Sequence, residues 1–155
     1  RLRRYARALT GERIAADDLV QDTLERAWRK LHLFRAGTDL RAWLFTVMHN
    51  VYVNQVRAAK LRYSDDASIE ELPLREPDAD GLVVRDLDRA LLALPPDQRE
   101  VVLLVALEDM SYEEAARTLE IPIGTVMSRL SRAREKLRGL MQGLPSGGHL
   151  RVVKS

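Results

Sequence analysis

The 155-residue sequence contains no cysteine, which excludes a disulfide framework, a thiolate metal site and a thiol nucleophile within it. No uninterrupted apolar run approaches the roughly 20 residues of a membrane-spanning helix, so we expect no membrane insertion and a cytoplasmic location. The three histidines, His32, His49 and His149, lie far apart, and we expect the first two to be polar surface residues. No nucleophile and base pattern, metal-ligand spacing or glycine-rich phosphate loop occurs, so we expect no enzyme, metal or cofactor.

Charge is plentiful but unevenly distributed along the chain. Charged residues make up 31% of the sequence and nearly cancel, to a net charge of +2. Residues 64–81 nevertheless contain seven acidic side chains and one base, Arg75, whereas residues 123–138 contain five bases and one acid, Glu135. The distribution therefore predicts an acidic middle between basic ends, and basic segments are candidates for contact with nucleic acid.

Apolar periodicity divides the chain into two helix-rich segments. Between Arg62 and Leu82 the period fails, two prolines and a glycine occur, and acidic residues dominate, which predicts a flexible linker. Since no strand pattern occurs, we expect an all-α protein with two small helical domains joined by this acidic linker. The expected limits are 1–60 for the first domain, 61–82 for the linker, 83–141 for the second domain and 142–155 for a flexible tail. Because the sequence opens on a basic helical pattern without a methionine, we also expect that some N-terminal sequence is missing.

Residues 111–137 have the pattern of a helix-turn-helix. Ser111 and Glu114 form a predicted capping box at the start of the first helix, and Pro122 lies in the turn. The predicted buried positions are Tyr112, Ala115, Ala116 and Leu119 in the first helix and Val126, Leu130, Ala133 and Leu137 in the second. Ser128, Arg129, Arg132 and Lys136 are then expected on the opposite side of the second helix. An apolar back and a cationic front are what a helix needs to enter the major groove.

The first segment predicts three helices, which is enough for a small core. In the first, the apolar positions are Leu2, Tyr5, Ala6 and Leu9. The second begins near Asp17, with Val20, Leu24, Ala27, Trp28 and Leu31 predicted to be buried and Asp18, Gln21, Asp22, Glu25 and Arg29 exposed. The third follows Thr38 as N-cap, with Leu40, Leu44, Val47, Met48 and Val51 as its buried stripe and Arg41, Asn50, Asn54 and Arg57 on its other side. In the second domain, a helix ending near Leu94 is followed by another in which Val102, Leu103, Ala106 and Leu107 are expected to face inward.

The order and spacing of five motifs resemble a bacterial sigma factor of the extracytoplasmic-function group. The motifs are residues 17–28 (DDLVQDTLERAW), 40–50 (LRAWLFTVMHN), 94–101 (LPPDQREV), 111–116 (SYEEAA) and 124–134 (GTVMSRLSRAR). The resemblance covers nearly the whole chain, with the first domain similar to sigma region two and the second to region four. It implies promoter-specific transcription initiation with RNA polymerase and control by an anti-sigma factor.

The resemblance also implies three surfaces. The acidic helix, with Asp18, Gln21, Asp22 and Glu25, would dock on the clamp helices of the largest polymerase subunit, and region four would meet the flap. The minus-ten element of the promoter would contact Phe34, Arg41, Asn50, Asn54 and Arg57, with Trp43 left open between core residue and DNA wedge. The minus-thirty-five element would contact Thr125, Ser128, Arg129, Arg132 and Arg134. Met127 and Ser131 depart from residues common among relatives, so no consensus sequence is transferred.

Two rival functions share parts of this pattern. A sigma-like mimic would sequester an anti-sigma factor without binding promoters, and it would not need the cations at Arg129, Arg132 and Arg134. A simple repressor or activator would share the helix-turn-helix but would leave the first domain unexplained, and we find no dimerisation element.

Overall fold

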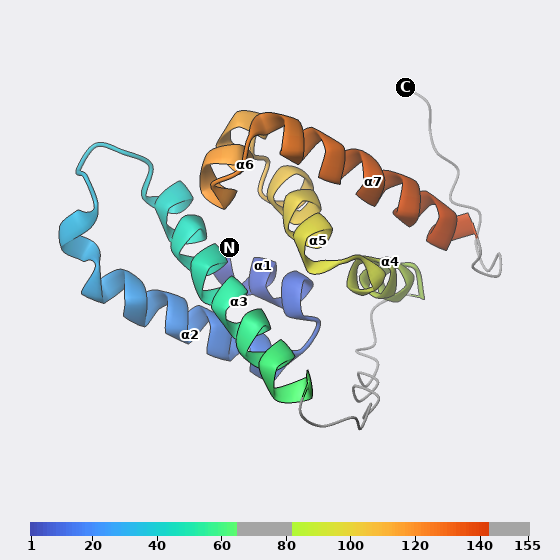
Figure 1. Cartoon of the computed structure of the whole chain (residues 1–155), viewed down its shortest axis with the longest axis horizontal. Helices are drawn as coiled ribbons and strands as arrows, with labels where there is room; N and C mark the ends of the chain where they lie inside the picture. The colour runs from blue at the N-terminus through green and yellow to red at the C-terminus, as the bar shows by residue number, and fades with distance from the viewer. Residues whose placement is uncertain (65–81, 143–155) are drawn as a thin grey trace.

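The computed structural model describes residues 1–64 and 82–142, and all regular structure in these residues is helical, as Figure 1 shows. The all-α prediction is confirmed. Most of the predicted linker and nearly all of the predicted tail lie outside the described residues. The elements are α1 (Leu2–Thr10), α2 (Arg13–Arg29), the 3₁₀ helix η1 (Leu31–Leu33), α3 (Leu40–Ser64), α4 (Leu82–Ala93), α5 (Pro96–Val102), the π-helix η2 (Leu103–Leu107), α6 (Tyr112–Leu119) and α7 (Ile123–Gln142).

Helices α1, α2 and α3 pack against one another in the first half of the chain (Figure 1). The buried side chains of α2 are Ala16, Leu19, Thr23 and Ala27. Our predicted stripe was wrong for three residues, since Leu24, Trp28 and Leu31 are exposed, Trp28 by 78%. Small side chains let α1 and α3 approach α2 closely, and the buried Thr23 hydroxyl is satisfied by donating to the Leu19 carbonyl at 2.7 Å.

Helix α3 begins at Leu40 because Asp39, rather than the predicted Thr38, caps it. The Asp39 carboxylate accepts from the backbone amides of Arg41, at 3.0 Å, and Ala42, at 3.3 Å. The Thr38 hydroxyl instead donates to the Arg35 carbonyl. The helix runs to Ser64, beyond the expected end of the first domain.

A π-helical turn follows α5 in the second half. Pro96 opens α5, where its missing N–H costs nothing. In η2 the hydrogen bonds widen, and the Glu108 amide donates to the Leu103 carbonyl at 3.1 Å. The changed winding makes one inward prediction wrong, because Ala106 is exposed while Leu104 is buried.

The helix-turn-helix formed by α6 and α7 agrees with the sequence pattern. Ser111 and Glu114 form both hydrogen bonds of the capping box, and Glu120 ends α6 in the left-handed conformation with φ of 55°. Ala115, Ala116 and Leu119 of α6 are buried, as are Val126, Leu130 and Ala133 of α7. Tyr112 and Leu137 are half-buried.

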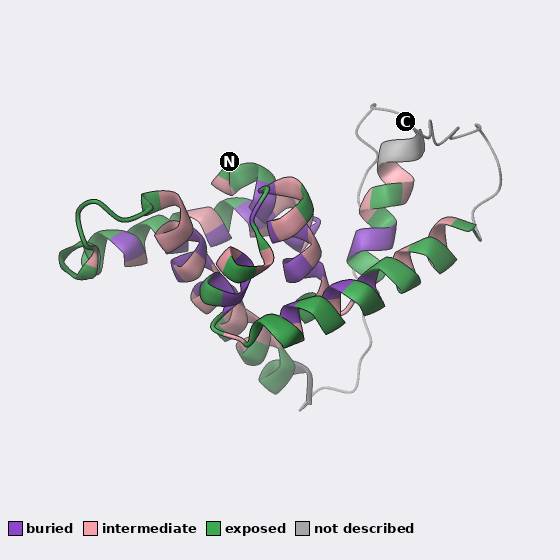
Figure 2. Cartoon of the chain, turned by 90° about the horizontal axis from the view of Figure 1, so that it is seen from above, coloured by how far each residue is buried: buried purple, intermediate pink, exposed green. Residues whose placement is uncertain are grey.

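One continuous core joins the two halves of the described chain. Side chains of α1 and α3 form a single apolar cluster with those of α4 to α7, and α3 lies beside α6. Within it Tyr5 and Phe45 pack edge to face, with ring centroids 5.0 Å apart. Figure 2 shows the buried residues gathered where the helices meet, while most of the outer surface of α7 is exposed.

Candidate nucleic-acid interface

The polar face of α7 carries most of the side chains predicted to read duplex DNA. At about 100° per residue, Thr125, Ser128, Arg129 and Arg132 fall on one side of the helix, and Arg132 and Ser128 are exposed. Arg134 is also exposed but lies half a turn from Thr125, so it is outside this face. The Arg129 Nε lies 3.6 Å from a carboxylate oxygen of Asp97, which holds the side chain near the start of α5.

The structure brings together three of the predicted minus-ten residues on α3. Asn50, Asn54 and Arg57 share one side of the helix, where Asn54 and Arg57 are exposed and Asn50 is half-buried. Arg41 precedes Asn50 by nine residues, about 180° around a helix, so our placement of Arg41 on the same side was wrong. Its guanidinium faces the second half of the chain and contacts Glu108.

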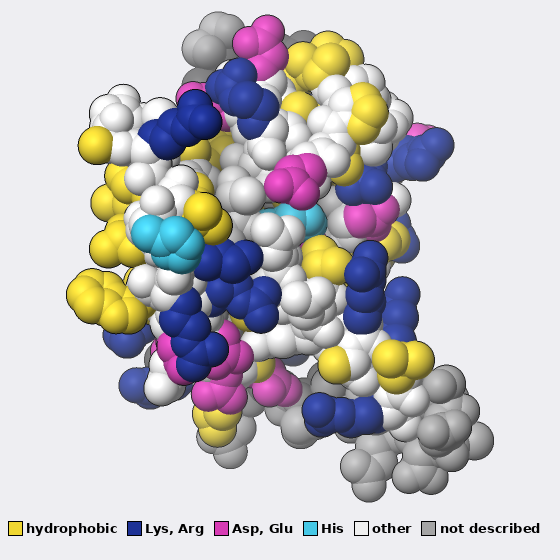
Figure 3. All heavy atoms as spheres, turned by 60° about the vertical axis from the view of Figure 1, so that its left-hand side comes forward, with side chains coloured by type: hydrophobic (Ala, Val, Ile, Leu, Met, Phe, Trp, Pro, Cys, Tyr) yellow, Lys and Arg dark blue, Asp and Glu magenta, His cyan; other side chains and the backbone are white. Residues whose placement is uncertain are grey.

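An aromatic pair lies at the start of α3. The rings of Phe34 and Trp43 are 5.3 Å apart and inclined at 48°, and both side chains are half-buried. Figure 3 brings this end of the molecule forward, and apolar side chains there lie among Lys and Arg. Aromatic faces beside cations are suited to unpaired bases, because the rings stack on bases and the cations pair with phosphates.

The outer side of α2 forms a second surface, which we call the α2 patch. It consists of Asp18, Gln21, Asp22 and Glu25 together with the exposed apolar residues Leu24 and Trp28. Asp22 accepts from Gln55 of α3 at 3.1 Å, and Glu25 pairs with Arg29 at 2.9 Å. An anionic surface with exposed apolar side chains is typical of a protein docking site.

Sequence reasoning missed the charged residues buried between the two halves. His49, expected at the surface, is mostly buried and bonds to the Glu100 carboxylate. Arg99 is 9% exposed and donates to four backbone carbonyls, one of them Leu9 of α1. Burial raises the pKa of the neighbouring Tyr52 hydroxyl, and the charge of Arg99 partly counters this. The only sequence signal for their burial was that these charged residues lie at helical positions flanked by apolar residues.

A pocket of about 340 Å³ lies between α3, the start of α5 and the helix-turn-helix. Arg57 of α3 and Arg129 of α7 both line it, together with the acids Asp97 and Glu100. Two side chains predicted to touch different promoter elements therefore border the same small space.

Two further properties hold within the described residues. None of their helices is long and apolar enough to cross a membrane. No group of three or more His, Asp or Glu side chains in this part of the chain is arranged to hold a metal ion.

The two halves match two known family profiles. Residues 1–49 match the sigma2 domain of PhyR, and residues 85–137 match sigma-70 region 4. The fold and these matches define a protein built from a sigma region-two module and a sigma region-four module.

Curated and solved relatives identify the family. The ECF RNA polymerase sigma factor EcfG of Rhodopseudomonas palustris is 39% identical over 142 residues, which cover 90% of this chain and 78% of EcfG. The sigma factor RpoE of Bartonella quintana, solved with the anti-sigma factor NepR, is 38% identical with a TM-score of 0.78 and coverage of 93% and 91%. CnrH, solved with the cytosolic domain of CnrY, is 30% identical with a TM-score of 0.65 and coverage of 91% and 80%. The chain belongs to the ECF RNA polymerase sigma factor family, and it is accordingly a non-enzymatic transcription factor.

Proposed function

We propose that this sigma factor directs RNA polymerase to promoters by reading two DNA elements with separate helices. The observation that carries the proposal is the division of α7 into a buried apolar side and a solvent-facing polar side, together with the exposure of Asn54 and Arg57 on one side of α3. Each helix thereby presents hydrogen-bonding and cationic side chains on a rigid support, which is what groove and strand recognition requires.

In the proposed upstream contact, α7 enters the major groove at the minus-thirty-five element. Ser128 and Arg132 read base edges, while Arg129 and Thr125 contact the backbone from the same face. Arg134 lies around the helix from them and reaches a flanking phosphate. Asp97 supports this arrangement because its ion pair limits the rotamers of Arg129.

In the proposed downstream contact, the region-two half holds melted bases of the minus-ten element. Asn50 and Phe34 line a pocket for an unpaired base, and Asn54 and Arg57 contact the strand. The half-buried pair of Phe34 and Trp43 supports this reading, because a partly exposed ring is free to stack on a base. Arg41 joins these contacts once it is released from Glu108.

The α2 patch is the proposed docking site for the clamp helices of the polymerase, and region four is proposed to meet the flap. The exposed Trp28 and Leu24 would supply apolar contact, and the surrounding acids would pair with a basic partner. The protein is further proposed to be held inactive by an anti-sigma factor. RpoE and CnrH are each solved with such a partner or its domain, and the likeness to both supports a partner of the NepR or CnrY kind.

Run-off transcription with purified core polymerase across a promoter library tests the proposal. Arg132→Ala should lower transcription from the preferred upstream sequence about tenfold and weaken discrimination at one position. Asn50→Ala should leave duplex binding intact but reduce open complexes, measured by permanganate reactivity of unpaired thymines. Arg117→Ala, an exposed arginine of α6 that belongs to neither proposed set of DNA contacts, is the matched control and should change neither result.

The sigma-like mimic remains the second candidate. The first half matches a profile named for PhyR, and PhyR is described as an anti-anti-sigma factor. A mimic would bind a NepR-like protein but give no open complex on any promoter. The exposed arginines of α7 favour the promoter-reading function, because a mimic has no use for them.

A further inference from the structure

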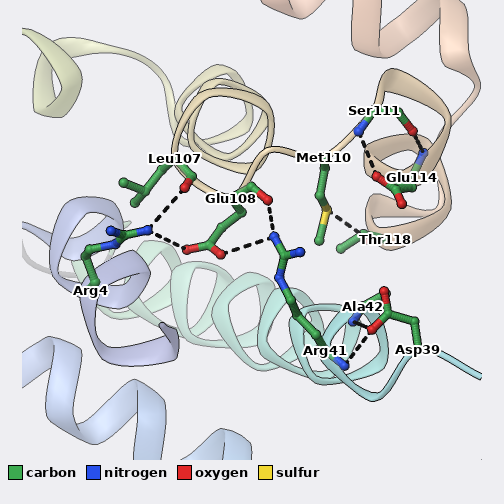
Figure 4. A network of polar contacts seen from close by, with 10 residues as sticks. All are labelled: Arg4, Asp39, Arg41, Ala42, Leu107, Glu108, Met110, Ser111, Glu114 and Thr118. Carbon is green, nitrogen blue, oxygen red and sulfur yellow. Dashed lines mark hydrogen bonds and ion pairs between the residues drawn. The ribbon is translucent and has the colours of Figure 1, made fainter.

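The two halves of the chain are joined by charged groups as well as by apolar packing. We call these groups the seam: Arg4, Arg41 and His49 from the first half, and Glu100 and Glu108 from the second. His49 bonds to Glu100, and both arginines contact Glu108, as Figure 4 shows for the arginines. Every one of these contacts crosses from one half to the other.

Glu108 is the most buried member of the seam. Its side chain is 0% exposed, with one carboxylate oxygen 3.3 Å from the Arg41 guanidinium and the other 3.9 Å from that of Arg4. Arg41 also donates to the Glu108 carbonyl, and Arg4 donates to the Leu107 carbonyl at 3.2 Å. The second carboxylate oxygen has no hydrogen-bond partner. The first half of the chain therefore compensates this buried charge incompletely.

The backbone around Glu108 is unusual on both sides. The π-helix η2 ends at the preceding residue, and Asp109 follows with φ of 54°, in the left-handed region that a non-glycine residue adopts at a cost. Together they turn the Glu108 side chain into the seam rather than outward (Figure 4). The backbone on both sides of Glu108 therefore directs this buried acid toward the two arginines.

The closed arrangement also conflicts with the proposed reading of two promoter elements. Elements centred at minus ten and minus thirty-five lie about 25 base pairs apart, or about 85 Å at 3.4 Å per pair. Arg57 and Arg129 border one pocket of about 340 Å³. Helices α3 and α7 must therefore separate before both elements can be contacted together.

We propose that Glu108 is a latch that holds the two halves closed and keeps Arg41 from DNA. This inference rests on the proposed function, because the closed state is inhibitory only if α3 and α7 read separate elements. A buried ion pair suits a reversible latch, since the cost of removing its charges from water offsets much of their attraction. Polymerase, on binding both halves, would have to offset these ion pairs together with the apolar contacts between the halves and the bond from Arg99 to the Leu9 carbonyl.

The absence of native cysteine allows a direct test on the full chain. Spin labels at Arg13→Cys of α2 and Ser131→Cys of α7, both exposed positions in different halves, report the distance between the halves by double electron–electron resonance. The unaltered chain should give one short, narrow distance distribution. Glu108→Gln removes the charge at nearly constant shape and should raise the ratio of open to closed molecules about tenfold or more.

Two further variants keep the test decisive. Arg4→Gln removes one latch contact from a residue that is itself exposed, so it should open the chain in part without affecting folding, as circular dichroism would verify. Glu113→Gln, an exposed acid of α6, is the matched control and should leave the distances unchanged. If Glu108→Gln and Arg4→Gln both keep the short distance, the latch is refuted. Opening without transcription from any promoter would support the latch and overturn the proposed function, whereas transcription by a chain that never opens would overturn the latch.

Discussion

Among the arginines of the described second half, residues 82–142, Arg99 is the one whose replacement should destabilise the protein most. The guanidinium donates four hydrogen bonds of 2.8 Å, to the carbonyls of Leu9, Leu91, Leu92 and Leu94. Leu91 and Leu92 lie in the last turn of α4 and Leu94 directly follows it, where carbonyls lack the i+4 amide partners of a helix interior. The fourth acceptor, the Leu9 carbonyl, belongs to the last turn of α1. The Arg99 side chain therefore binds carbonyls at the ends of two helices and links the two halves.

The loss of stability in Arg99→Ala depends on how well the four freed carbonyls find other hydrogen-bond donors. Hydrogen bonds from a charged donor contribute about 1.5–3 kcal/mol each, but water reaches some of the freed carbonyls, so the four do not simply add. Arg99→Ala should therefore lower the free energy of unfolding by about 3–5 kcal/mol, as for other broken buried networks. Arg99→Lys keeps the charge but cannot reach all four carbonyls, and should cost roughly half as much.

Urea denaturation followed by far-ultraviolet circular dichroism measures both variants. Arg117→Ala, an exposed arginine on α6, provides the baseline and should change stability by no more than about 0.5 kcal/mol. A loss below about 1 kcal/mol for Arg99→Ala would refute the reasoning, because it would mean that the four carbonyls are satisfied equally well without the guanidinium.

Three other predictions test local features. Gly11→Ala should cost about 1–3 kcal/mol in thermal unfolding, because φ is +77° and a Cβ would lie 2.7 Å from the Leu92 methyl carbons, whereas Gly37→Ala, with φ of +91° and open space, should cost only the backbone strain. Ser111→Ala removes the capping box and should cost about 1 kcal/mol in the same measurement, an expectation contradicted by an unchanged melting temperature. Burial raises the pKa of Tyr5 well above its usual 10, so the stability it contributes is complete below about pH 10 and is lost as pH rises toward the folded pKa. Tyr5→Phe should therefore flatten the alkaline decline seen in urea midpoints, by up to about 1.4 kcal/mol per pH unit, and an equally steep decline in the variant would count against this origin.

The sequence predicted the helix-turn-helix well because its signals are local. A capping box acts over three residues, and the apolar positions of α7 repeat within one helix, so both can be recognised without knowing what packs against them. The same reasoning failed on α2. The spacing of large apolar residues assigned Trp28 to the core. In the structure α2 packs tightly against its neighbours through smaller side chains, among them Ala16 and Ala27, and Trp28 is exposed.

The seam could not be predicted because its partners are distant in sequence. Arg41 and Glu108 are separated by 67 residues, and His49 and Glu100 by 51. An acidic residue in an apolar helix gives no indication of which basic side chain will pair with it in the fold. The π-helical turn adds a second difficulty, since it changes which residues face inward after Leu103 without any glycine or proline to mark it.

The backbone contact of Arg99 and the side-chain contacts of Glu108 would behave differently in chimaeras that combine a first half and a second half from different sigma factors. Arg99 binds the carbonyl of Leu9, and every amino acid supplies a carbonyl at that point, so this link survives whatever residue a donor sequence brings. Glu108 requires guanidinium groups at two particular positions, so it discriminates between compatible and foreign first halves. Exchanges of modules among related sigma factors should therefore retain their fold more readily than their closed state, and a first half without arginine at these two positions should form the closed state less readily.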